Sequence, residues 1–380
     1  PRTSFHTMGL ALDLNTFTGA QNYSVSIAGT VSGYGATTTG ILFNSGGVHQ
    51  VVVESTGQVF GREAAILANS GNHVQTINNL GLISTNGFPR PAIDLLGSGG
   101  TFIDNRGTIA SSVSSAIRFE SGALDTNVIN NVGIISAVSA AAFAIQADTV
   151  FSSLETVTNT GSIIGNVLLG SGSDTLTNTG TIVGDVLMGD GIDFVDNREG
   201  LINGFADLGD GADTYLGSER ATSNFDNVAG GSGNDTINGG AGNDNLNGGA
   251  DSDFLNGGSG NDDLIGGTGN DEYVIVSQGD TIFENAGDAF DSVRASVSFA
   301  LVANDHIEFM STTNEFGTAS INLTGNALEQ DITGNAGNNV LDGGQDTLSD
   351  GLIGRFGNDT YIVRSSTDLI IEDAGQGTLD

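Results

Sequence analysis

Aspartate side chains recur at one fixed spacing between residues 230 and 274. The segment reads GGSGNDTIN, GGAGNDNLN, GGADSDFLN, GGSGNDDLI and GGTGNDEYV, which are five nonapeptides in one register. In every unit the aspartate is followed two residues later by an apolar residue, so an acidic and an apolar series run together. The aspartates are Asp235, Asp244, Asp253, Asp262 and Asp271. Carboxylates in such a series could bind cations.

The glycines of each unit determine the backbone conformation next to these carboxylates. Paired and fourth-position glycines permit the positive φ of a tight turn, and the short apolar remainder can form only a brief strand. Alternating turns and strands predict a coil of parallel β-structure. With two nonapeptides per turn, Asp235, Asp253 and Asp271 lie along one edge and Asp244 and Asp262 along the other, about 4.8 Å apart in each stack.

Stacked carboxylates at this spacing repel one another. At an effective dielectric of about 20, each neighbouring pair repels by roughly 3 kcal/mol, so the coil requires bound cations. Carboxylate and carbonyl oxygens in a flexible loop suit the roughly six to eight ligands of calcium better than the strict octahedron of magnesium. Zinc is disfavoured because the chain has no Cys and its four His are scattered.

The phrase is similar to the G-G-x-G-x-D-x-U-x repeat of RTX proteins, the calcium-binding parallel β-roll. The resemblance implies that each ion lies between two loops of one edge, held by the five aspartates and by carbonyl groups of loop glycines. These glycines are Gly231, Gly233, Gly240, Gly242, Gly249, Gly258, Gly260, Gly267 and Gly269. The third unit has Asp251 and Ser252 where Gly and Asn stand elsewhere, and we expect its turn to persist because Asp tolerates left-handed geometry. A disordered linker is disfavoured, because linkers do not keep an apolar residue at every ninth position.

A looser repeat precedes residue 230, in which a Gly is followed two residues later by Val or Ile and is often preceded by Asn at minus two. The marker glycines are Gly29, Gly57, Gly81, Gly107, Gly133, Gly161, Gly180 and, more loosely, Gly200. Their spacing averages about 26 residues as far as Gly161, a period typical of solenoid repeats, and then becomes shorter. A second marker keeps the same period at Ile41, Ile66, Ile93, Ile117 and Ile145. Two markers with one period predict the rungs of a right-handed parallel β-helix.

The two repeats are predicted to join in one coil. The half-motifs GSGSDTL, GDGIDFV and GDGADTY place Asp174, Asp193 and Asp213 at nearly equal intervals, and Asp235 follows after a similar one. We therefore expect an all-β solenoid with a wide-rung β-helix over 1–160, narrow rungs with one calcium-type edge over 161–228, and an RTX β-roll over 229–274. A β-rich insert over 275–324 then precedes a second, degenerate RTX-like module over 325–380.

The last module repeats part of the roll. The sequence NDEYVIVSQGDTIFENAG of residues 270–287 recurs as NDTYIVRSSTDLIIEDAG in residues 358–375. In its first units Gln330 and Asn339 stand where the roll has Asp, so we expect these units to stack without tight ion binding. The closing RFGNDTY restores Asp359 as a metal candidate, although Arg355 stands where a second Gly is expected.

Composition indicates an acidic extracellular protein. The formal net charge is −35, and all ten basic residues are Arg, so nucleic acid and anionic membranes are disfavoured as partners. The absence of Cys fits a protein that is exported unfolded and stabilised by metal rather than by disulfides. No apolar run is long enough to span a membrane. Because the chain opens at Pro1 without a leader and stops within a recurring module, we expect a fragment of a longer secreted protein, exported by type I secretion from a Gram-negative bacterium.

Catalytic motifs are absent from the sequence. None of the four His lies in H-E-x-x-H, no Ser lies in G-x-S-x-G, and a P-loop is impossible without Lys. Parallel β-helices also occur in polysaccharide lyases, but only Asp94, Arg118 and Glu120 fall near one rung face, and we interpret them as solvated residues of an outer strand. No catalytic or organic-cofactor residue is therefore assigned.

These observations predict a secreted, calcium-binding structural protein of the cell surface or extracellular matrix, similar in role to a surface-layer protein or an adhesin. Calcium ions are the expected ligands, with other copies of the chain or cell-surface polysaccharide as possible partners. One alternative is a non-catalytic or glycan-active module of a larger secreted RTX enzyme. Another is a subunit of a self-assembling extracellular sheet or filament.

Overall fold

The computed structural model describes residues 2–5, 12–13, 22–33, 39–43, 48–68, 73–87, 90–96, 99–120, 125–147, 149–150, 152–220, 225–287, 289–345 and 347–372. These residues form strands joined by turns, with no helix among them, which confirms the all-β fold class. The described residues therefore contain no helix long and apolar enough to cross a membrane. The chain divides into two compact units, unit 1 (Pro1–Asp210) and unit 2 (Gly211–Asp380).

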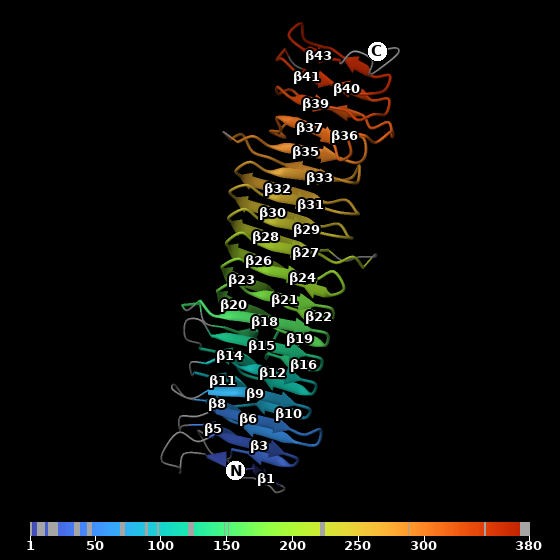
Figure 1. Ribbon diagram of the computed structural model, residues 1–380. Helices are drawn as coiled ribbons and strands as arrows, with labels where there is room; N and C mark the ends of the chain where they lie inside the picture. Colours follow the sequence, from blue (N-terminus) through green and yellow to red (C-terminus); the bar gives the residue numbers. More distant parts are fainter. Residues whose placement is uncertain are drawn as a thin grey trace. The chain divides into compact units, whose positions relative to one another are not determined.

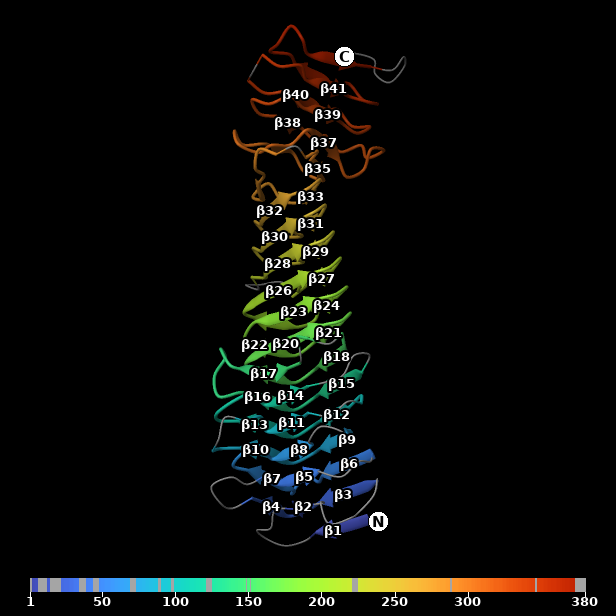
Figure 2. The ribbon, with the colours of Figure 1, turned by 90° about the vertical axis from the view of Figure 1, so that its left-hand side faces the viewer.

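Unit 1 is a parallel β-solenoid with three strands per rung, one in each of three sheets (Figures 1 and 2). Sheet 1 consists of β1 (Arg2–Phe5), β3 (Tyr23–Ile27), β6 (Val48–Val53), β9 (His73–Asn79), β12 (Phe102–Asn105), β15 (Thr126–Asn131), β18 (Leu154–Asn159), β21 (Thr175–Asn178) and β24 (Phe194–Asp196). Sheet 2 consists of β4 (Thr30–Ser32), β7 (Gln58–Gly61), β10 (Leu82–Thr85), β13 (Thr108–Ser111), β16 (Ile134–Ser136), β19 (Ser162–Ile164), β22 (Thr181–Val183) and β25 (Leu201–Asn203). Sheet 3 consists of β2 (Leu12–Asp13), β5 (Ile41–Phe43), β8 (Ile66–Ala68), β11 (Ile93–Leu95), β14 (Ile117–Phe119), β17 (Phe143–Gln146), β20 (Asn166–Ser171), β23 (Val186–Asp190) and β26 (Phe205–Asp210).

The strand registers of unit 1 confirm both sequence markers. In sheet 3 the second marker forms one series of direct partners, namely Ile41, Ile66, Ile93, Ile117 and Ile145. In sheet 2 the residue after each marker glycine pairs with its counterpart one rung away, from Thr30 opposite Gln58 to Thr181 opposite Leu201. A methyl group on Gly107 would overlap the carbonyl oxygen of Gly81, so glycine is needed where successive turns approach closely.

Aliphatic side chains directed into the coil form the core of unit 1. In sheet 1 one series of partners is at most 2% exposed: Val25, Val51, Ile77, Ile103, Ile129, Val157, Leu176 and Val195. Burial of each such side chain contributes about 1.5–3 kcal/mol. The stack continues where the rung becomes shorter, because Val157 pairs with Ile129 of the last wide rung and with Leu176 of the first narrow one.

A buried ladder of asparagines lies at the turn between sheets 1 and 2. Its members are the asparagines two residues before the marker glycines: Asn79, Asn105, Asn131, Asn159 and Asn178. The Nδ2 atom of each donates to the Oδ1 atom of the next at 2.7–2.8 Å, and the series ends at Asn197. Because an amide carries both a donor and an acceptor, each member from Asn79 to Asn178 donates to the next, whereas Nδ2 of Asn197, at the end, has no partner among the described residues.

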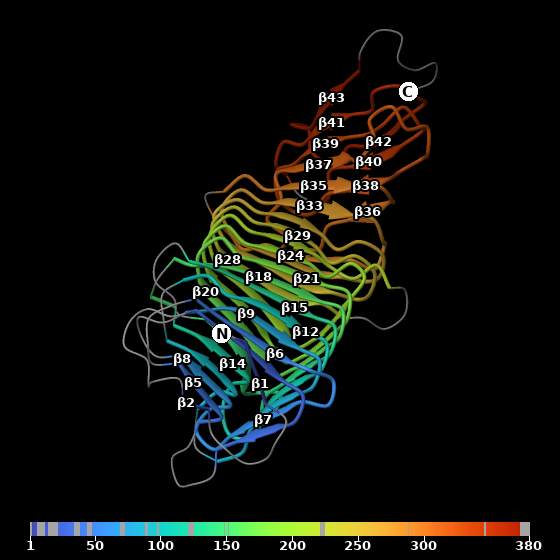
Figure 3. The ribbon, with the colours of Figure 1, turned by 60° about the horizontal axis from the view of Figure 1, so that its bottom comes forward.

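Unit 2 is a parallel β-solenoid with two strands per turn (Figure 3). Sheet 4 consists of β27 (Thr214–Leu216), β29 (Thr236–Asn238), β31 (Phe254–Asn256), β33 (Glu272–Ile275), β35 (Ser292–Ala295), β37 (Phe309–Thr312), β39 (Asp331–Thr333), β41 (Gly351–Ile353) and β43 (Leu369–Ile371). Sheet 5 consists of β28 (Asn227–Ser232), β30 (Asn245–Ala250), β32 (Asp263–Thr268) and β34 (Thr281–Phe283). Sheet 6 consists of β36 (Phe299–Ala300), β38 (Leu323–Thr324), β40 (Val340–Asp342) and β42 (Thr360–Ile362).

The apolar residues of alternate nonapeptides stack in register. Ile237 pairs with Leu255 and Leu255 with Tyr273 in sheet 4, whereas Leu246 pairs with Leu264 in sheet 5. All five side chains are fully buried. Two nonapeptides therefore make one turn, as the spacing predicted.

Stacking continues through residues 275–324, where the nonapeptide phrase lapses. Val293 in β35 pairs with Tyr273, and Met310 in β37 pairs with Val293, and both side chains are fully buried. Sheet 6 begins in this segment with Phe299 of β36, which pairs with Leu323 of β38. The buried residue of each strand thus keeps its place while the connections between strands change in length.

Candidate metal centre

Two stacks of buried aspartates line the turns of unit 2. The turns that enter sheet 4, called edge 1, carry Asp213, Asp235, Asp253, Asp271 and Asp291. The turns that enter sheet 5, called edge 2, carry Asp226, Asp244, Asp262 and Asp280. Every one of these side chains is at most 4% exposed. The predicted separation of the five nonapeptide aspartates between two edges is confirmed.

One oxygen of each carboxylate is positioned by the backbone of the preceding turn. On edge 1 the amide of Asp235 donates to Oδ1 of Asp253, and the amide of Asp253 donates to Oδ1 of Asp271, both at 2.8 Å. On edge 2 the amide of Asp244 donates to Oδ1 of Asp262 at 2.9 Å. Hydrogen bonds to charged groups contribute about 1.5–3 kcal/mol each. They hold the carboxylates in one orientation along the stack.

The other oxygen, Oδ2, lacks this support in all five nonapeptide aspartates. It is buried and accepts no hydrogen bond from any described residue. It lies over the first glycine of its own unit, because a methyl group on that glycine would be within 2.5 Å of Oδ2. These glycines are Gly230, Gly239, Gly248, Gly257 and Gly266. A buried acceptor without a partner costs about 1–3 kcal/mol, and more when charged, so a cation that reached Oδ2 would remove a penalty.

The same burial disfavours the ionised form of these carboxylates. Burial raises the pKa of Asp235, Asp244 and Asp253 to about 7, and neighbouring aspartates add to the effect, whereas the backbone hydrogen bond opposes it. Burial also raises the pKa of Asp262 and Asp271. Without a cation, ionisation of these buried carboxyl groups is costly. Their hard oxygen atoms suit an oxygen-preferring divalent cation such as calcium.

The turn glycines have the backbone geometry that the resemblance requires. All nine glycines named as carbonyl ligands have φ between 89° and 153°. Asp251 has φ 74°, so the third turn persists with aspartate in place of glycine, as expected. Arg355 adopts φ 71° at the second position of the last unit, where the third unit has Gly249. Coordination of an ion by the glycine carbonyls stays a prediction.

Unit 1 contains a shorter acidic stack at the turn between sheets 3 and 1. The amide of Glu155 donates to Oδ1 of Asp174, and the amide of Asp174 donates to Oδ1 of Asp193, both at 2.7 Å. Burial raises the pKa of Asp174 to about 9, and Oδ2 of Asp174 accepts no hydrogen bond from a described residue. In unit 2 the amide of Asp213 donates to Oδ1 of Asp235 at 2.8 Å. Ion binding by Asp174, Asp193 and Asp213, and the alignment of this edge between the units, stay predictions.

Amide side chains replace the carboxylates in the first turns of the last module. Nε2 of Gln330 donates to Oδ1 of Asn326 at 3.0 Å. Nδ2 of Asn339 donates to the carbonyl oxygen of Ile321 at 2.7 Å and to Oδ1 of Asn335 at 3.1 Å. These donors occupy hydrogen bonds within the protein, so the position needs no ion. The next turn returns to aspartate, because the amide of Asn339 donates to Oδ1 of Asp359 at 2.7 Å.

Several acidic residues of the stacks were missed by the sequence analysis. Asp226 precedes Asp244 and Asp280 follows Asp262 at the spacing of two nonapeptides, so extending the repeat by one unit would have found them. Asp291 follows Asp271 at a slightly longer interval, and its Oδ1 accepts the amide of Asp271 at 2.8 Å. Glu155 and Asp350 also lie in stacks, but neither belongs to a recognisable phrase.

The upstream residues considered for catalysis form a buried ion-pair group. Asp94 is fully buried and accepts hydrogen bonds from Arg118 at 2.8 and 3.0 Å and from Arg90 at 3.1 Å. Glu120 pairs with Arg118 at 3.0 Å. The interpretation of Asp94 as a solvated residue was wrong, because two guanidinium groups compensate its burial. The two arginines instead hold Asp94 in a fixed ion-pair group.

Comparison with known families supports the metal-binding interpretation. The model of the RTX calcium-binding nonapeptide repeat matches residues 220–255 and 242–273, which include Asp235, Asp253 and Asp271 of edge 1 and Asp226, Asp244 and Asp262 of edge 2. No curated protein and no solved structure matched the chain. Repeats of this kind bind calcium in general, and the matched residues include all five nonapeptide aspartates whose Oδ2 atoms accept no hydrogen bond from a described residue.

Proposed function

We propose that this chain, whose residues 220–273 carry RTX calcium-binding nonapeptide repeats, is a calcium-dependent structural protein of the cell surface or extracellular matrix, similar to a surface-layer protein or an adhesin. One observation carries the proposal. In five consecutive nonapeptides, a buried aspartate has one oxygen fixed by a backbone amide and one oxygen with no hydrogen-bond partner among the described residues. Calcium supplies the missing partner.

Calcium then acts as a folding ligand. Without the ion, neighbouring carboxylates of a stack repel by roughly 3 kcal/mol per pair, and the net charge of −35 expands the chain. With the ion, the same carboxylates become ligands that hold successive turns together. The resulting solenoid is rigid and presents a repetitive surface. Its physical role is to span distance and to present that surface to a partner.

An extracellular location follows from the same requirement. Calcium is scarce in cytosol and abundant outside cells, and a chain without Cys relies on metal rather than on disulfides. Export of an unfolded chain by type I secretion, followed by folding in external calcium, would suit a Gram-negative source. Other copies of the chain, or cell-surface polysaccharide, are the proposed partners.

Chelation tests the proposal directly. Far-UV circular dichroism during EGTA titration should show loss of β-signal, which returns when excess calcium is added. Metal analysis of the purified protein should show several bound calcium ions per chain. A β-signal and a melting temperature that are both unchanged by EGTA would refute calcium-dependent folding.

A further inference from the structure

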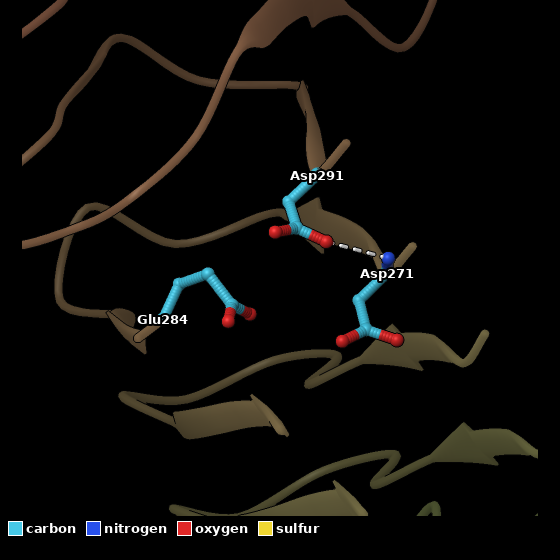
Figure 4. Close-up of side chains that lie close together, drawn as sticks. All are labelled: Asp271, Glu284 and Asp291. Carbon is cyan, nitrogen blue, oxygen red and sulfur yellow. Dashed lines mark hydrogen bonds between the residues drawn. The ribbon is translucent and has the colours of Figure 1, made fainter. Parts of the chain in front are cut away.

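Three buried carboxylates from three consecutive segments meet at the end of the nonapeptide repeats (Figure 4). Asp271 precedes β33, Glu284 follows β34 and Asp291 precedes β35. Each offers an oxygen atom, and these oxygens lie within 4.8 Å of one another. The side chains are 1%, 6% and 2% exposed, respectively. Among the described residues, no other group of three or more Asp, Glu, His or Cys side chains is close enough to hold a metal ion.

The unsupported oxygen of Asp271 points into this group. Its Oδ2 atom accepts no hydrogen bond from a described residue. A methyl group on Gly266 would lie within 2.5 Å of Oδ2 of Asp271, Oε2 of Glu284 and the hydroxyl oxygen of Tyr273. Three oxygen atoms therefore converge on the space above Gly266, which only glycine leaves open.

The remaining oxygens of the group are already oriented by the protein. Oδ1 of Asp291 accepts the amide of Asp271 at 2.8 Å, and Oε1 of Glu284 accepts the amide of Asn285 at 2.9 Å. The hydroxyl group of Tyr273 donates to Oε2 of Glu284. None of the ion pairs among the described residues includes any of the three carboxylates. Their charge is thus uncompensated by arginine.

The core of this arrangement recurs in the last module. A methyl group on Gly354 would lie within 2.7 Å of Oδ2 of Asp359, the hydroxyl oxygen of Tyr361 and Oε1 of Glu372. The Tyr361 hydroxyl donates to Glu372, as Tyr273 donates to Glu284. Residues 373–375, which complete the recurring sequence, lie outside the described residues. The repeated sequence thus places glycine, aspartate, tyrosine and glutamate in the same geometry twice.

We propose that Asp271, Glu284 and Asp291 form a calcium site of a second kind, which joins the last nonapeptide to the two segments that follow it. The inference rests on the proposed function. It differs from the loop sites because two of its three carboxylates lie outside the nonapeptides. Hard carboxylate oxygens suit calcium, and water can complete the coordination from a cavity of about 400 Å³ lined by Glu284 and the turn 267–270. The site fastens β34 and β35 to the roll.

Calcium stoichiometry of full-chain variants tests the site. Glu284→Gln keeps the size of the side chain and its ability to accept from Tyr273 but removes the charge. We expect it to bind about one calcium ion fewer than the wild type. Glu329→Gln, a change of an exposed glutamate in the same unit, should bind as many ions as the wild type. Asp291→Asn, which keeps Oδ1 as an acceptor, should also lose about one ion.

Terbium luminescence gives a second readout that does not depend on counting ions. The chain has no Trp, so tyrosine is the sensitiser, and Tyr273 lies at the proposed site. Tyrosine-sensitised emission from bound Tb³⁺ should fall in Tyr273→Phe and in Glu284→Gln but not in Glu329→Gln. If the wild type binds no calcium, the proposed function fails. If the wild type binds calcium while Glu284→Gln keeps the same stoichiometry and emission, the second kind of site is refuted alone.

Discussion

Replacement of Asp253 by Asn should change stability in opposite directions with and without calcium. Asp253 lies in the middle of edge 1, where its Oδ1 accepts the amide of Asp235 and its own amide donates to Asp271, both at 2.8 Å. Asparagine keeps the Oδ1 acceptor and the backbone amide. The substitution therefore removes the charge and the Oδ2 ligand while it preserves the hydrogen bonds that align the stack.

The magnitude without calcium follows from the raised pKa. Burial is the main cause of the rise in the pKa of Asp253 from 3.8 to about 7, which corresponds to about 4 kcal/mol against the ionised form at pH 8. Asparagine avoids this cost. However, its Nδ2 group would be buried over Gly248, and a buried donor without an acceptor costs about 1–3 kcal/mol. We expect the calcium-free variant to gain about 1–3 kcal/mol.

With calcium the sign reverses. Loss of one ion that is present at about 10,000 times its Kd removes about 5.5 kcal/mol of stability, which exceeds the gain of about 1–3 kcal/mol in the calcium-free state. The neighbouring carboxylates, Asp235 and Asp271, then share less positive charge. The calcium-bound variant should therefore be less stable than the calcium-bound wild type by about 2–4 kcal/mol, which is the lost binding free energy minus the gain in the calcium-free state.

Urea unfolding at pH 8, followed by far-UV circular dichroism, measures both states. Samples contain either saturating calcium or excess EGTA. Trimethylamine N-oxide is added to both, because it stabilises the folded state enough for the unfolding free energy of the calcium-free protein to be measured. Asp331→Asn, a change of an exposed aspartate in β39, is the matched control and should change neither state by more than about 0.5 kcal/mol. If Asp253→Asn destabilised the protein equally in EGTA and in calcium, ion-relieved repulsion would be the wrong explanation of the stack.

Three further predictions concern the remaining parts of the solenoid. In EGTA, the protein should be more stable at pH 5 than at pH 8, because the pKa of Asp235 and Asp244 is raised to about 7. The folded state then binds more protons than the unfolded state between about pH 4 and pH 7, so stability falls as the pH rises through that window. Gly248→Ala should lower calcium affinity and cost about 2 kcal/mol or more in calcium, since its methyl group would overlap Oδ2 of Asp253. Asn105→Ala should cost about 3 kcal/mol with or without calcium, because three hydrogen bonds of the asparagine ladder are lost.

Each of these predictions has its own control and its own contradicting result. Saturating calcium should weaken the pH dependence, and greater stability at pH 8 than at pH 5 in EGTA would contradict the raised pKa values. Gly287→Ala is the glycine control, because the nearest atom to its methyl group would be 3.8 Å away, and equal effects at both glycines would count against the overlap. Asn203→Ala, which removes an exposed asparagine of unit 1, is the control for the ladder. A cost for Asn105→Ala that appeared only in EGTA would show that its ladder depends on calcium.

Spacing in the sequence was sufficient to predict the stacks, because a parallel coil converts a sequence period directly into neighbouring positions. The partners Ile41 and Ile66, or Leu246 and Leu264, could be named in advance for this reason. Positive φ at the glycines followed from the same repeat. The predicted turn is also present at Asp251, which has φ 74°, because aspartate tolerates the left-handed conformation.

Contacts between segments without a common phrase could not be predicted in this way. Glu284 approaches Asp271 only because β34 and β33 occupy successive sides of one turn, and the segment between them carries no period. Similarly, the sequence placed Asp94 and Arg118 on one rung face but could not reveal that Asp94 is fully buried. Arg90, which accompanies Arg118 at this carboxylate, belongs to no repeat that could have indicated the contact.

The choice between asparagine and aspartate explains which turns need the ion. A stacked polar residue in a parallel coil meets an identical residue one turn away, so it must both donate and accept to be satisfied. Asparagine does so, and the ladder through Asn105 and Asn131 is closed by its own hydrogen bonds. Aspartate can only accept, so Asp253 takes one amide through Oδ1 and leaves Oδ2 without a donor among the described residues.

The last module provides the comparison within one unit of the protein. The side-chain amide of Asn339 donates to the carbonyl oxygen of Ile321. In Asp253 the equivalent side-chain atom is Oδ2, which cannot donate and accepts no hydrogen bond from a described residue. Calcium dependence should therefore follow the residue type at the stacked position rather than the unit in which the turn lies. Turns with amides should resist EGTA, and turns with aspartate should open first. Hydrogen exchange in EGTA, resolved by residue, would contradict this rule if the amides around Asn339 exchanged as fast as those around Asp253.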